Sequence, residues 1–97
     1  MARNQKLTAV IRGRKVESVE QVEGQATVTF GDGSRMVIRT GAPLADPTPT
    51  GTVKAVRQRG TLLQMDYEEG GTLEVTTAEE TSSVLLRDRD QRFEYAD

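Results

Sequence analysis

The chain has 97 residues, of which 29% are charged, 35% hydrophobic and 4% aromatic, and its formal net charge is −2. It contains no cysteine and no histidine, which excludes disulfides, thiol nucleophiles and thiolate metal sites, and removes the side chain that most often serves as general base. The length suits one domain, so we expect a single non-enzymatic domain, 1–97, that uses no cofactor and no metal.

The longest apolar stretch near the start is the short run 7–11, which includes a threonine. A secretory signal needs about 7–15 apolar residues and a membrane-spanning helix about 20. We therefore expect a cytoplasmic protein without membrane contact. Arginine outnumbers lysine, which is typical of a GC-rich, bacterial genome.

The chain resembles itself at an offset of 37 residues, which aligns residues 16–40 with residues 53–77 without a gap. Identical residues occupy five aligned positions: Val16/Val53, Val19/Val56, Gln21/Gln58, Gly33/Gly70 and Thr40/Thr77. A period of this size is typical of repeated supersecondary units. We expect an internal repeat, 13–40 and 51–77, joined by a Pro-rich linker at 41–50, because proline favours extended linkers over ladder hydrogen bonds.

Apolar and polar residues alternate within each copy, as they do along half-buried strands. The alternation predicts two hairpins, the first from strands 26–30 and 35–39 and the second from strands 63–67 and 72–76. Glycine at 33 and at 70 favours tight type I′ turns. A strand of the form Val-x-x-Val precedes each hairpin, and its spacing predicts a bend or bulge between the valines.

Three further segments complete the expected secondary structure. Residues 7–11 should form a strand, and residues 83–96 a C-terminal hairpin. Only 77–82 has a helical composition, enough for one turn. The sequence therefore predicts an all-β small barrel or sandwich built from two homologous three- to four-stranded β-meander units, an SH3-like barrel being one form of it, with little or no helix.

The alternation also assigns side chains to the two faces of the sheet. We expect the following to point inward: Val10, Val16, Val19, Ala26, Val28, Phe30, Met36, Ile38, Val53, Val56, Leu63, Met65, Tyr67, Leu73, Val75, Val84, Leu86 and Phe93. Four other apolar residues fall on the opposite faces of their strands and are the candidate protein interface: Val37, Leu62, Leu85 and Tyr95. Such residues either cover the far side of a sheet or contact a partner.

Positive charge gathers at the start of each copy. The candidate nucleic-acid contacts are Arg12, Arg14, Lys15, Lys54, Arg57 and Arg59. They either meet phosphates as a basic strip or form a solvated surface that pairs with glutamates and protects strand edges.

No motif predicts catalysis. The segment 88–90 has the start of a calcium loop but lacks the glycine and the later ligands of that loop. The adjacent glutamates at 68–69 and 79–80 fit solvated surface charge, and the glycines open no helix that would hold a phosphate.

The stretch Gly51-Thr52-Val53-Lys54-Ala55-Val56, followed by Gly60 and an alternating strand, resembles the turn-and-strand pattern of KOW and other SH3-like barrels. This resemblance implies a small barrel and contact with RNA or the transcription machinery. From the residues themselves, we expect first a protein-interaction or self-assembly module, in which no small-molecule substrate is evident. Nucleic-acid binding by the basic strand edges is the alternative.

Overall fold

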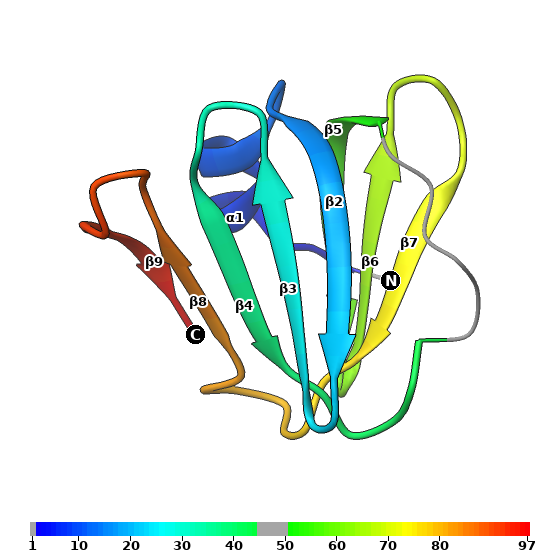
Figure 1. The fold of residues 1–97 in the computed structure, drawn as a ribbon. Helices are drawn as coiled ribbons and strands as arrows, with labels where there is room; N and C mark the ends of the chain where they lie inside the picture. The colour runs from blue at the N-terminus through cyan, green and yellow to red at the C-terminus, as the bar shows by residue number, and fades with distance from the viewer. Residues whose placement is uncertain (1, 45–50) are drawn as a thin grey trace.

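Antiparallel strands make up most of the computed structural model, which describes residues 2–44 and 51–97. Its elements are β1 (Ala2–Arg3), α1 (Gln5–Ile11), β2 (Lys15–Val22), β3 (Gln25–Phe30), β4 (Arg35–Arg39), β5 (Gly51–Arg59), β6 (Leu62–Tyr67), β7 (Thr72–Thr76), β8 (Val84–Arg87) and β9 (Phe93–Ala96). Eight strands follow one another in the order β7-β6-β5-β2-β3-β4-β8-β9, and β1 pairs with β5 (Figure 1). The all-β prediction is confirmed, but the described strands form one open sheet and not a closed barrel or a two-sheet sandwich.

The strands β2–β4 and β5–β7 form two meanders whose pairing registers correspond at a spacing of 37 residues. Val16 pairs with Phe30 and, correspondingly, Val53 pairs with Tyr67. A register shift follows each of these two valines, at Ser18 in β2 and at Ala55 in β5. The bulge predicted from the Val-x-x-Val spacing is therefore confirmed in both strands.

The two meanders meet at two places, and each meeting pairs residues that occupy the same place in the two copies. Lys15 of β2 lies opposite Thr52 of β5, and Thr40, after β4, forms an isolated bridge with Thr77, after β7. Hydrogen bonds flank this bridge on both sides, from Gly41 N to Thr76 O at 2.9 Å and from Ala78 N to Arg39 O at 2.8 Å.

The hairpin turns differ from the expected type I′. Gly33 donates its N–H to Phe30 O at 3.0 Å, and Phe30 N donates to Ser34 O at 2.9 Å. Gly33 has φ +90°, but Asp32 is not among the residues with positive φ. A type I′ turn needs positive φ at both central residues, so the geometry is that of the longer turn with a glycine bulge. The second hairpin repeats it at Gly70, with φ +98°.

The first 11 residues contain a helix where we expected a strand at 7–11. Asn4 caps α1, because its Oδ1 accepts the N–H of Leu7 at 3.0 Å. Leu7, Thr8 and Ile11 are the buried residues of α1 and lie on one helical face. Thr8 Oγ1 accepts the N–H of Val56 at 2.9 Å and donates to Val56 O at 3.3 Å, so the helix provides hydrogen-bond partners for the backbone N–H and C=O of Val56 in β5. Capping and burial thus outweigh the strand propensity of the β-branched residues.

Two expectations for the last 21 residues are also wrong. The segment 77–82 forms a bridge residue, Thr77, followed by bends at 78–82, and not a helical turn. In the C-terminal hairpin, Leu86 pairs with Tyr95 while Arg87 pairs with Phe93, so a bulge at Glu94 interrupts the alternation of β9. Phe93 therefore faces outward and is 64% exposed, whereas Tyr95 packs against the core.

The core lies between the curved sheet and α1, which Figure 1 places behind β3 and β4. Fifteen of the residues expected to point inward are buried, and Val10 and Val19 pack against them as partly buried side chains. The helix adds two core residues that the alternation did not assign, Leu7 and Ile11. Burial of about 1.5–3 kcal/mol per large apolar side chain makes this cluster the main source of stability.

Replacing Tyr67 by phenylalanine should raise the free energy of unfolding by about 1 kcal/mol, because the Tyr67 hydroxyl is buried without a hydrogen-bond partner among the described residues.

Burial also raises the pKa of Tyr67 to about 12. Since the unfolded side chain titrates near 10, wild-type stability should fall as pH rises from about 10 towards 12, and the variant should lose less. Urea unfolding at pH 7 and pH 11 measures both effects. Tyr95→Phe is the control. The Tyr95 hydroxyl accepts a hydrogen bond from Asn4 at 3.0 Å, so its removal should not raise the free energy of unfolding. A less stable Tyr67→Phe protein would contradict this account.

Candidate binding surface

The basic residues proposed from the sequence do not form one strip. Arg14 and Arg57 each form a bidentate ion pair within the chain. Arg14 donates two hydrogen bonds to the Glu94 carboxylate, and Arg57 donates two to the Asp66 carboxylate. The remaining four are exposed at different places: Arg12 after α1, Lys15 at the start of β2, and Lys54 and Arg59 on β5. Two of the six side chains are thus occupied by structural contacts.

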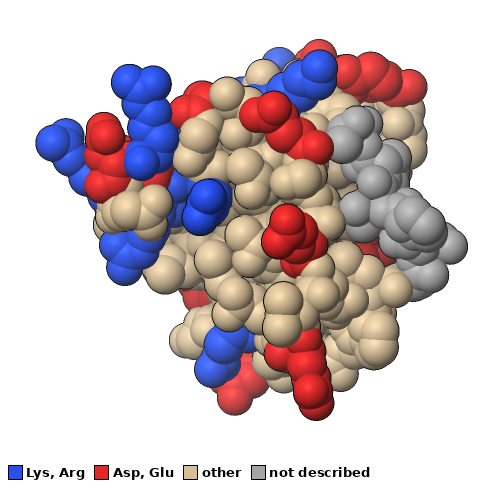
Figure 2. Space-filling view, viewed as in Figure 1, with Lys and Arg blue, Asp and Glu red and all other residues tan. Residues whose placement is uncertain are grey.

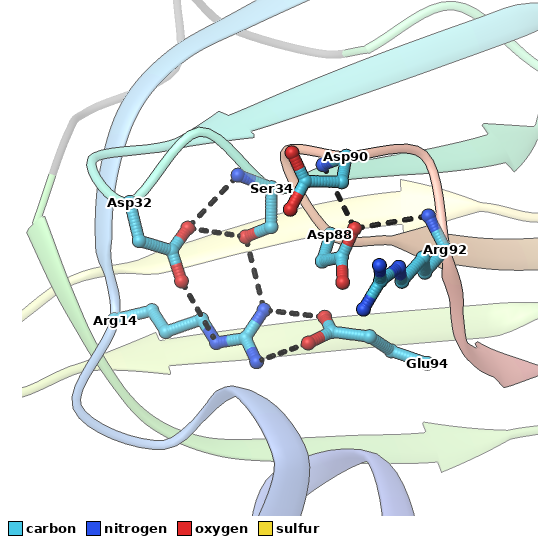
Figure 3. A network of polar contacts seen from close by, with 7 residues as sticks. All are labelled: Arg14, Asp32, Ser34, Asp88, Asp90, Arg92 and Glu94. Atoms are coloured by element: carbon cyan, nitrogen blue, oxygen red, sulfur yellow. Dashed lines mark hydrogen bonds and ion pairs between the residues drawn. The ribbon is translucent and has the colours of Figure 1, made fainter.

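Arg14 is the centre of a polar network that joins the start of β2 to the hairpin β8–β9 (Figure 3). Its guanidinium donates to Glu94 at 2.7 Å and 3.0 Å and to Ser34 Oγ at 2.9 Å. Its Nε lies 3.5 Å from Asp32 Oδ2, and its Cζ lies 6.0 Å from the centre of the Phe30 ring. The network therefore fixes how β9 is held against the body of the sheet.

The charges of this network stabilise one another. The hydrogen bonds to Glu94 raise the pKa of Arg14, against the opposing effect of burial. Burial raises the pKa of Asp32, but hydrogen bonds from Ser34 and the charge of Arg14 outweigh it and leave this pKa below its usual value. Both shifts favour the charged forms, so Arg14 and Asp32 stabilise each other within the network.

The second bidentate pair lies within the other meander. Arg57 Nε and Nη2 each donate to Asp66 at 2.8 Å, and Thr72 Oγ1 donates to the same carboxylate at 2.8 Å. The Arg57 bonds, with a smaller contribution from Thr72, lower the pKa of Asp66. Arg57, Asp66 and Thr72 together link β5, β6 and β7 on the outer face of the sheet.

The four apolar interface candidates separate in the structure. Val37 of β4 lies directly opposite Leu85 of β8, and Leu85 lies opposite Ala96 of β9. We call Val37, Leu85 and Ala96 the apolar row. Leu62 belongs to β6, at the other end of the sheet order, and Tyr95 faces the core, where its hydroxyl contacts Asn4.

A second row runs beside the apolar row on the same outer face. Arg35 of β4 lies opposite Arg87 of β8, and Arg87 lies opposite Phe93 of β9. We call Arg35, Arg87 and Phe93 the cationic row; all three side chains are exposed. Rows on one face of a strand are about 7 Å apart, because two residues separate them. Figure 2 shows Lys and Arg side chains gathered over the hairpin β8–β9, with acidic side chains among them.

Sequence reasoning missed the cationic row although part of its signal was present. Arg35 and Arg87 alternate with Met36 and Leu86, both of which were expected inside, so their outward orientation follows from the strand period. The position of Phe93 could not be inferred, because a bulge leaves no mark in the alternation of so short a strand.

A hollow of about 440 Å³ lies at the end of this face and is lined by residues that include Leu85, Ala96 and Val84. A smaller one of about 290 Å³ lies between Asp32 and the segment 88–90. Within the described ranges, no group of three or more carboxylates is arranged to hold a metal ion. Among the same residues, no helix has the length and apolar character needed to cross a membrane.

The outer face of β4, β8 and β9 thus combines half-buried and exposed apolar side chains with exposed aromatic and cationic ones. Comparison of the chain with protein-family models, with curated proteins and with solved structures finds no match in any of the three.

Proposed function

We propose that this chain is a non-enzymatic binding module that docks a protein partner on the outer face of β4, β8 and β9. The observation that carries the proposal is the apolar row, in which Val37 and Leu85 lie side by side on adjacent strands and remain only half-buried. Solvent-facing aliphatic side chains on neighbouring strands provide the apolar centre of an interface, and polar side chains around them provide its rim. The partner is a second protein or a second copy of this chain.

We also propose that the module arose from a duplicated meander unit whose six strands, β2–β7, make a partly closed barrel. Three observations support this: the matched registers, the matched bulges, and the pairing of equivalent residues where the two units meet. The identical residues Gln21 and Gln58 make comparable contacts, since each side-chain amide bonds a residue outside the three strands of its own meander. Gln21 bonds Ala42 O and Leu44 N, and Gln58 bonds Asn4.

A photo-crosslinking amino acid at position 37 tests the docking surface, with position 74 as the matched control. Both positions lie on the outer face of the third strand of a meander, because Val37 pairs with Thr27 and Glu74 pairs with Gln64. We expect a discrete crosslinked protein, identified by mass spectrometry, from position 37 in the cells that produce the chain, and none from position 74. Equal products at both positions, or none at position 37, would overturn the proposal.

Nucleic-acid binding is the second candidate, and the exposed ring of Phe93 beside Arg87 favours it. An exposed aromatic ring next to arginine is the arrangement on which unpaired bases stack. Under this alternative, the product from position 37 should be sensitive to nuclease and should contain no second protein.

A further inference from the structure

We infer that the partner docked on this face presents an extended acidic segment with an apolar side chain at its centre. The inference rests on the proposed docking surface and names the chemistry that surface recognises. It follows from the charges that flank the apolar row and from their spacing along β4.

The first observation is a pair of like charges. Arg35 and Arg87 lie directly opposite each other, and neither has a carboxylate within ion-pair distance among the described residues. Like charges in directly opposite positions of a sheet destabilise it. A carboxylate placed between the two guanidinium groups would remove this repulsion, and the planar guanidinium suits carboxylates.

The second observation is a third arginine on the other side of the apolar row. Arg39 pairs with Glu79 at 3.6 Å, and their side chains are 55% and 66% exposed. An ion pair this exposed contributes little, so a partner's carboxylate can replace Glu79 at small cost. The outer face of β4 therefore presents the order Arg35, Val37, Arg39.

The spacing of these three residues fits a peptide. Alternate residues of a strand lie about 7 Å apart on one face, and an extended partner segment has the same repeat. A segment that runs along β4 would place an acidic, an apolar and a second acidic side chain at positions i, i+2 and i+4. A polynucleotide would use the arginines and Phe93 but would leave Val37 and Leu85 without an apolar contact.

The test is selection of peptides from a random 12-residue display library on the immobilised wild-type chain. We expect an enriched motif with Asp or Glu two residues to either side of an aliphatic residue. A synthetic peptide with that motif should lose at least tenfold in affinity, measured by fluorescence anisotropy, in Arg35→Gln and Arg87→Gln. Arg12→Gln and Lys54→Gln are the controls, since Arg12 and Lys54 are exposed but lie outside β4, β8 and β9. The affinity of each control variant for the peptide should stay within twofold of wild type.

The possible failures can be distinguished. Enriched peptides that depend on Val37 but carry no acidic residues, or that bind Arg35→Gln as tightly, would overturn this inference and leave the docking surface intact. Peptides that bind Val37→Thr as tightly as wild type, or no enrichment at all, would overturn the docking surface as well. Tighter binding of a labelled 12-nucleotide single strand than of any peptide, lost in Phe93→Ala, would replace the acidic peptide by nucleic acid. Circular dichroism and thermal unfolding check that each variant is folded; Val37→Thr keeps the β-branched shape that a strand favours.

Discussion

Truncation of Leu7 to alanine should lower the free energy of unfolding by about 2–5 kcal/mol, the usual loss when a buried leucine is removed from a core. Leu7 is fully buried and belongs to the central apolar cluster, so the truncated side chain leaves a cavity under α1. A domain of this size is stable by only about 5–15 kcal/mol, which makes the loss a large part of the total. Urea unfolding followed by circular dichroism measures it.

The matched control for this prediction is Ala9→Ser, on the exposed face of the same helix. It should cost about 0.5 kcal/mol, the difference in helix propensity. If Leu7→Ala were no more costly than Ala9→Ser, residues 5–11 would not pack as the helix described here.

Replacement of Arg14 by methionine should lower the free energy of unfolding by about 1–3 kcal/mol and should loosen the hairpin β8–β9. The side chains of Arg14 and Glu94 are 19% and 24% exposed, so the variant leaves a partly buried carboxylate without its partner. The amides of β9 should then exchange with solvent faster than those of β3, which hydrogen exchange followed by NMR resolves.

A double-mutant cycle separates the Arg14–Glu94 contact from other effects of substitution. Arg14→Met combined with Glu94→Leu should cost less than the sum of the two single changes, with a coupling of about 0.5–3 kcal/mol. The pair Arg57–Asp66 provides the comparison, since Arg57 is more exposed, at 36% of its side chain, and its cycle should give a smaller coupling. Additive costs for Arg14 and Glu94 would show that the network does not hold the hairpin.

The two hairpin units and their bulges could be predicted because local signals and the repeat pointed to the same structure. Val16 and Val53 lie near the start of strands with the same interrupted spacing, and Gly33 and Gly70 occupy the same position in the turns that follow β3 and β6. Each signal acts within a few residues, and the repeat at an offset of 37 residues showed the same pattern a second time for each strand of the two hairpin units. Local propensity and long-range pairing agree here, which is typical of a well-specified fold.

The helix α1 and the outward position of Phe93 could not be predicted in the same way. Asn4 is a suitable N-cap, but the run 7–11, which contains β-branched residues, also fits a strand. Only packing against β5 decides between the two. Phe93 turns outward because of one bulged residue, Glu94, whose position is fixed by its contact with Arg14 from the far end of the chain. Both features depend on contacts distant in sequence.

The candidate surface could also be predicted only in part from the sequence. The sequence placed Val37 and Leu85 on the outer face, and the structure brings them together because β4 pairs with β8. It could not separate Arg14 and Arg57 from the other basic residues, since their carboxylate partners lie 80 and 9 residues away. Arg35 and Arg87, neither of which has a carboxylate within ion-pair distance among the described residues, could be placed side by side only when the strand order was known; Arg87 donates one hydrogen bond, to Gln91 O at 2.9 Å.

The most direct test of the docking surface is a methyl NMR titration of the isotope-labelled chain with the partner captured from position 37. Chemical-shift changes concentrated on the methyl groups of Val37, Leu85 and Ala96 are the result we expect, with Leu62 and Val75 of the other meander unchanged. Changes concentrated on β5–β7, with the apolar row unaffected, would contradict the account.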